Sequence, residues 1–168
     1  MLNTEELKSA LSEEIRIIRH LATKVDGAKL DWRPTEGQRS TQELLRYLAL
    51  VGSGPLKAML AGDWDVIAGM DAKLEGLGLA GFDAAMESQE RDIHAEIDAL
   101  GDSGLAEREG MMPWGDSLPM GKAIFTTSFR FLCAYRMQLF LYLKQSGAGE
   151  LGTSNAWLGM DAPEESAV

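Results

Sequence analysis

The sequence predicts an all-α protein folded as an up-down four-helix bundle, and three observations lead to this prediction. Four segments repeat apolar side chains every three or four residues, which is the period of a helix with one buried face. No segment alternates apolar and polar residues with the period of a strand, so we expect no strands. The last helical segment, 125–143, contains no Gly or Pro and is long enough for about five turns.

Length and composition indicate one globular domain. The chain has 168 residues, of which 45% are apolar and 25% charged, as is usual for a protein with a single core. Its net charge of −10 repels nucleic-acid backbones and anionic membranes, so we expect neither as a partner. One cysteine, Cys133, excludes an intrachain disulfide, and neither a signal segment nor a membrane-spanning run is present. These features predict a cytoplasmic protein.

The first two helices are predicted from their caps and apolar stripes. Thr4 or its neighbour can cap the first helix, and acidic residues follow in its first turn. Ser40 with Glu43 matches a capping box at the start of the second helix. The Gly-Ser-Gly-Pro sequence at 52–55 is expected to kink or break this second helix, which then resumes for a turn or more.

Two long connections are predicted on either side of the third helix. Glycines interrupt the apolar residues of 63–80, so we expect a loop with short helical turns there. The third helix runs from Phe82 to the glycine-containing segment 101–104. The second connection, 105–119, is long enough to be a functional loop. Its Trp114 is either part of a lid or partner surface, or a cap over the open end of the bundle.

The expected division of the chain is a bundle at 1–150 and a C-terminal tail at 151–168. We expect the tail to dock partly on the bundle, with Trp157 and Leu158 as the docking side chains. The Pro-Glu-Glu-Ser sequence at 163–166 is expected to be frayed.

Several motifs resemble the DinB-like superfamily in their order and spacing. The segments 30–34 and 40–49 resemble the linker and second helix of that superfamily, and 113–119 resembles the loop before its last helix. The sequence Tyr-Arg-Met-Gln-Leu at 135–139 resembles its His-Arg-Gly-Gln-Leu signature, and 152–161 is similar to the tails of some members. The resemblance covers nearly the whole chain.

The resemblance implies a four-helix bundle, often dimeric, that holds a divalent metal such as zinc or nickel. The implied ligands are three histidines, one from the second helix and two, four residues apart, from the last helix. Such a pair projects two imidazoles from one helix face, and the third histidine completes a site that stays open to water or thiolate. Some relatives are transferases or isomerases that use low-molecular-weight thiols.

The positions that the resemblance assigns to the metal ligands hold Tyr47, Phe131 and Tyr135. Phenylalanine cannot bind a metal, and tyrosine binds one only after losing a proton whose pKa is about 10. The two histidines of the chain, His20 and His94, lie on other predicted helices. We therefore expect no metal cofactor, and we assign no catalytic residue.

A ligand pocket between the second and last helices is the functional hypothesis that follows. Its candidate lining residues are Tyr47, Trp114, Ser128, Phe131, Tyr135 and Gln138. The alternative is that the aromatic rings only pack in the core, with their hydroxyl groups hydrogen-bonded. Likewise, Arg130 and Arg136 either contact an anionic ligand or pair with carboxylates, and Cys133 is more simply explained as an inert buried thiol.

Three functions remain open at this point. The first is a protein without the metal site that binds a small apolar or anionic molecule, or a partner subunit. The second is a metal- or thiol-dependent transferase or hydrolase with atypical ligands, or an enzyme that uses Tyr47 or Tyr135 as an acid. The third is a structural homodimer, and a homodimer is also the assembly that we expect.

Overall fold

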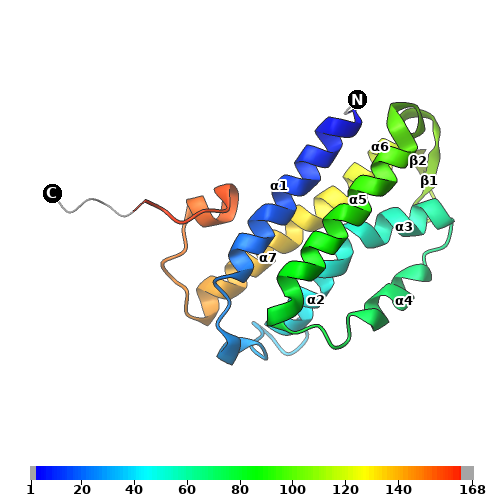
Figure 1. The fold of residues 1–168 in the computed structure, drawn as a ribbon. Helices are drawn as coiled ribbons and strands as arrows, with labels where there is room; N and C mark the ends of the chain where they lie inside the picture. The colour runs from blue at the N-terminus through cyan, green and yellow to red at the C-terminus, as the bar shows by residue number, and fades with distance from the viewer. Residues whose placement is uncertain (1–2, 164–168) are drawn as a thin grey trace.

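The computed structural model describes residues 3–163, in which long helical segments pack side by side (Figure 1). The expected all-α four-helix bundle is confirmed. The bundle helices, in chain order, are α1 (Thr4–Ala22), α2 (Thr41–Val51) continued by α3 (Ser53–Ala61), α5 (Leu79–Glu107), and one segment formed by α6 (Met120–Ile124), η2 (Phe125–Phe129) and α7 (Arg130–Ser146). None of the described helices is both long and apolar enough to cross a membrane.

The four bundle helices do not alternate in direction along the chain. α1 and α2 each pack against both α5 and α7. Contacts between α2–α3 and α5 advance together, from Leu48 with Gln89 to Lys57 with Asp92, so these two segments run parallel. α1 runs antiparallel to α5, because Lys8 pairs with Asp98 near one end and Arg19 with Asp83 near the other. A parallel pair of consecutive helices requires a long connection between them.

That connection contains a short helix, α4 (Val66–Lys73), as the expected helical turns indicated. It lies against α2 and α3 and returns the chain to the end of the bundle where α2 begins (Figure 1). Gly62, in the left-handed conformation with φ of 67°, ends α3 and starts this return. No residue of α4 is fully buried, so the helix covers the bundle without entering its core.

Both helix caps and the break near Gly52 follow from the sequence. Asn3 and Glu6 form a capping box at α1, and Ser40 and Glu43 form the predicted one at α2. At the break, the buried side chain of Gln89 accepts hydrogen bonds from the amides of Gly52 and Ser53, at 2.8 and 3.1 Å. The Gln89 amide also donates to the carbonyl of Leu48, at 3.0 Å. One side chain thus satisfies backbone groups that a helix break would leave buried and unpaired.

Two expectations about the chain after the third helix are wrong. Gly101 kinks α5 with φ of 61° and ψ of 176°, but the helix continues to Glu107 instead of ending there. β1 (Glu109–Met111) and β2 (Ser117–Pro119) then form an antiparallel hairpin, with Gly110 opposite Leu118. Strands of three residues are too short to show the alternation by which a strand is predicted from sequence.

The long last helix contains a π-helical turn, η2, which its unbroken sequence does not reveal. Thr127 and Ser128 in this turn are fully buried. The Thr127 hydroxyl donates to the carbonyl of Ala123 at 2.8 Å. The Ser128 hydroxyl has no hydrogen-bond partner in the described part of the chain.

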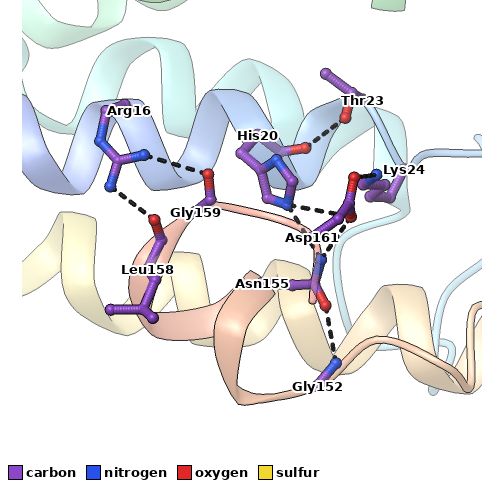
Figure 2. A network of polar contacts seen from close by, with 9 residues as sticks. All are labelled: Arg16, His20, Thr23, Lys24, Gly152, Asn155, Leu158, Gly159 and Asp161. Carbon is purple, nitrogen blue, oxygen red and sulfur yellow. Dashed lines mark hydrogen bonds and ion pairs between the residues drawn. The ribbon is translucent and has the colours of Figure 1, made fainter. Parts of the chain in front are cut away.

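A polar network holds the C-terminal segment against α1 (Figure 2). Arg16 donates to the carbonyls of Leu158 and Gly159, at 2.8 and 3.2 Å. Asp161 pairs with Lys24 at 2.7 Å and accepts a hydrogen bond from Asn155 at 2.9 Å. The segment is therefore held to α1 through both its backbone carbonyls and its Asp161 side chain.

The side chains expected to dock this segment are not the ones that do so. Trp157 and Leu158, in the π-helical turn η3 (Ser154–Leu158), are 57% and 54% exposed. The buried residues are Leu151, Asn155 and Ala156. The Trp157 indole instead lies beside the Arg136 guanidinium, 4.9 Å from Cζ to the ring centre. Apart from Pro163, the segment expected to be frayed lies outside the described residues.

Candidate functional site

The structure brings together Tyr47 of α2 and Tyr135 of α7. Their rings meet edge to face, with centroids 4.7 Å apart and an angle of 74° between the planes. Arg39, just before α2, lies close to both rings, with its Cζ 4.0 Å from the Tyr47 centroid and 5.8 Å from that of Tyr135. A guanidinium over an aromatic ring is held by cation–π attraction without a carboxylate partner.

The environment of Tyr47 keeps its phenol protonated. Burial, together with the neighbouring Tyr135, raises the pKa of Tyr47 to about 12. At neutral pH the hydroxyl is therefore uncharged. It can donate a hydrogen bond, but it does not supply a phenolate to act as a base or as a metal ligand.

The other predicted site residues have different surroundings. Phe131, one helical turn before Tyr135, is half-buried against the core. Gln138 donates to the Tyr142 hydroxyl at 2.8 Å, and that hydroxyl donates to the Arg39 carbonyl at 3.0 Å, so Gln138 helps to fix the linker before α2. Trp114 is 57% exposed on the hairpin, at the opposite end of the bundle from that linker (Figure 1).

An open cleft of about 800 Å³ adjoins Tyr47. It lies between the linker 33–39, α2 and the segment 64–71, which includes most of α4. Of the six predicted pocket residues, Tyr47 lines this cleft and the other five do not. The cleft lies on the side of α2 that faces α4, not on the side that faces α7. Its apolar and aromatic surface is formed by Tyr47, Leu50, Trp64 and Ile67.

Three arginines line this cleft and differ in their partners. Arg33 pairs with Glu43 at 3.4 Å. Arg39 and Arg46 form no ion pair with any described carboxylate, and the Nε of Arg46 is buried without a hydrogen-bond partner in residues 3–163. Two guanidinium groups therefore face the cleft with donors that the protein does not use.

Sequence reasoning did not identify these arginines. One signal was available, because Arg33, Arg39 and Arg46 fall within fourteen positions of a chain whose net charge is −10. The opposite wall of the cleft, at 64–71, is separated from them in sequence by the whole of α3. No local pattern could place the two segments together.

Comparison with solved structures assigns the architecture. A crystal structure of a DinB-like protein from Bacillus subtilis matches 87% of this chain and 94% of its own, with a TM-score of 0.67 at 16% sequence identity. The chain has the DinB-like fold. No protein-family model matches the sequence, and no curated protein does. At this identity the likeness shows the fold alone, so function has to be argued from the residues of the site.

The residues of this DinB-like fold do not fit the three-histidine metal that the superfamily implies. The corresponding positions carry a phenylalanine, with no donor atom, and two tyrosines, of which Tyr47 holds its proton to a pKa of about 12. Among the residues that the structure describes, no three His, Cys, Asp or Glu side chains lie close enough to hold a metal. His20 faces Asn155 at 3.1 Å, and His94 faces Ser12 at 2.8 Å, both away from Tyr47 on α1 and α5.

The remaining candidates on the last helix face α1 and the C-terminal segment. Arg136 is 3% exposed, pairs with Glu14 at 2.7 Å and donates to the Ala156 carbonyl. Burial, and then the Glu14 carboxylate, raise the pKa of the Cys133 thiol to about 11. An arginine in a structural ion pair and a protonated thiol are poor candidates for ligand contact or catalysis.

Proposed function

We propose that this DinB-like bundle is a binding protein that takes a small anionic molecule into the cleft beside Tyr47, without a metal. One observation carries the proposal: Arg39 and Arg46 line the cleft without an ion pair in residues 3–163. A carboxylate or similar planar anion in the cleft would accept hydrogen bonds from the guanidinium groups of these arginines in a paired geometry.

The remaining surface of the cleft suits the body of such a molecule. Its volume of about 800 Å³ lies in the range of small-molecule sites. Tyr47, Leu50 and Trp64 offer aromatic and apolar contacts. The Tyr47 hydroxyl is uncharged at neutral pH, so it does not repel an anion.

The test is calorimetric titration of the protein with benzoate and with phenyl phosphate. We expect both probes to bind, and we expect Arg39→Gln and Arg46→Gln each to weaken binding at least about ten-fold, the value of one charge-assisted hydrogen bond. Arg130→Gln is the matched control, because Arg130 is exposed on α7 outside the cleft and its loss changes the net charge equally. Failure of both probes to bind, or equal binding by the Arg39 and Arg46 variants, would overturn the proposal.

A further inference from the structure

The two walls of the cleft carry charges of opposite sign. The linker and α2 contribute Arg39 and Arg46, and the α4 side contributes Asp65 and Asp71. In the described chain, no ion pair crosses the cleft. Arg33 and Glu43, which both lie on the wall formed by the linker and α2, pair with each other. Positive and negative groups therefore face one cavity without neutralising each other.

Asp65 and Asp71 have no evident role in stabilising α4. Asp65 occupies the N-cap position of the helix, where an aspartate usually accepts a backbone hydrogen bond, but its side chain makes none. Asp71 lies in the last turn of α4, where the helix dipole disfavours a negative charge. Both side chains are exposed and line the cleft. Asp65 therefore does not stabilise α4, and Asp71 destabilises it.

The charge balance of the cleft favours a ligand that carries a cationic group in addition to its anionic group. When the Arg33–Glu43 pair is set aside, the lining residues leave two guanidinium groups and three carboxylates, the third being that of Glu36. An anion attracted by Arg39 and Arg46 would also be repelled by the carboxylates. A cationic group on the same molecule, directed toward α4, turns that repulsion into attraction.

We infer that the ligand of this cleft is a small zwitterion with an apolar or aromatic body. Its anionic group binds Arg39 and Arg46, and its ammonium group binds Asp65 and Asp71. The body lies against Tyr47 and Trp64. This inference rests on the proposed function and names the class of molecule that the same site takes.

Three probes with one aromatic body separate the contributions of the charges. Phenylalanine carries both charges, N-acetylphenylalanine carries only the anion, and phenethylamine carries only the cation. In calorimetry at neutral pH and low salt, we expect phenylalanine to bind at least about ten-fold more tightly than either of the others. We also expect Arg46→Gln to weaken both carboxylate probes and to leave phenethylamine unchanged or bound more tightly.

The double variant Asp65→Asn with Asp71→Asn tests the acidic wall directly. We expect it to reduce the affinity for phenylalanine to that for N-acetylphenylalanine, without weakening the latter. Asp31→Asn is the matched control, because Asp31 is exposed and lies outside the cleft lining. The contrary result is that N-acetylphenylalanine binds as tightly as phenylalanine and still depends on the arginines. That result would overturn the inference of a zwitterionic ligand and leave the proposed function intact. Binding of none of these probes, benzoate and phenyl phosphate included, would overturn both.

Discussion

Tyr47 has one neighbour in the bundle and another in the cleft. Its ring packs edge to face on Tyr135, and its face also supports the guanidinium of Arg39. Because the ring holds Arg39 in place without forming a hydrogen bond to it, the planar donors of Arg39 stay available to a ligand. The aromatic residue at the position where the resemblance implies a metal ligand thus orients the guanidinium of Arg39.

The Cys133 thiol gives a prediction at the residue scale. Burial and Glu14 raise the pKa of this thiol from 9.0 to about 11, so at pH 8 its thiolate fraction is about 100-fold lower than that of an unshifted thiol. We expect a chromogenic disulfide reagent to react with the native protein about 100-fold more slowly than with the chain unfolded in denaturant.

The raised pKa of the Cys133 thiol also makes the stability of the protein depend on pH. The native state favours the protonated thiol, so its contribution to stability is complete below about pH 9 and is lost as the pH rises toward 11. Cys133→Ser should abolish the reaction with the reagent altogether. Equal rates for native and unfolded wild-type protein would show that the thiol is not protected.

At the scale of elements, the α2–α3 break depends on Gln89. We expect Gln89→Leu to lower the free energy of unfolding by about 3 kcal/mol, because it leaves the amides of Gly52 and Ser53 and the carbonyl of Leu48 without their partner. Urea denaturation followed by circular dichroism measures the change. Gln145→Leu, at an exposed position on α7, is the matched control and should change stability by no more than about 0.5 kcal/mol. A Gln89 variant as stable as this control would refute the role of Gln89.

α4 forms one wall of this cleft and also borders a second cleft. It contributes Ile67 and Asp71 to the cleft, and its other side, with Met70 and Lys73, lines a second cleft of about 340 Å³ against α5. Leu50 of α2 lies beneath it and lines both. A helix with open space on two sides and no fully buried residue has fewer packing contacts to lose when it moves than any bundle helix.

At the scale of the whole molecule, topology creates the cleft. Because α5 runs parallel to α2, the chain must return along the outside of the bundle, and the returning segment carries α4 over α2. An alternating bundle with a short loop at this point would leave the outer face of α2 uncovered. The crossover thus supplies a second wall to a surface that would otherwise be flat.

Restoring the implied ligands tests whether the bundle geometry alone could hold a metal. We expect the triple variant Tyr47→His, Phe131→His and Tyr135→His to bind about one equivalent of zinc or nickel, because three imidazoles on α2 and α7 recreate an open metal site. Metal analysis after exhaustive dialysis should show none in the wild-type protein and none in Tyr47→His alone. Stoichiometric metal in the wild-type protein would contradict the binding role proposed for these residues.

Much of the bundle could be predicted from sequence because its determinants are local. The apolar stripes, the Ser40 capping box and the break near Gly52 are all set by neighbouring residues. Helix direction is not set by neighbouring residues, because the apolar period is the same for either orientation. The parallel arrangement of α2 and α5 therefore could not be predicted. The π-helical turn has no distinctive composition, and the facing walls of the cleft come from segments far apart in the chain. The homodimer and the cytoplasmic location stay predictions.

The π-helical turn at η2 has a consequence for changes of chain length. A π-helix uses a wider turn than an α-helix, so it accommodates one surplus residue without disturbing the helices on either side. Deleting a residue at the start of α7, before Arg136, would rotate everything beyond it by about 100° and turn Arg136 and Leu139 away from their partners. Deleting one within 125–129 would instead convert the turn to α-helix and leave both flanking faces in register. The last helix therefore tolerates a single-residue deletion at this turn far better than along α7.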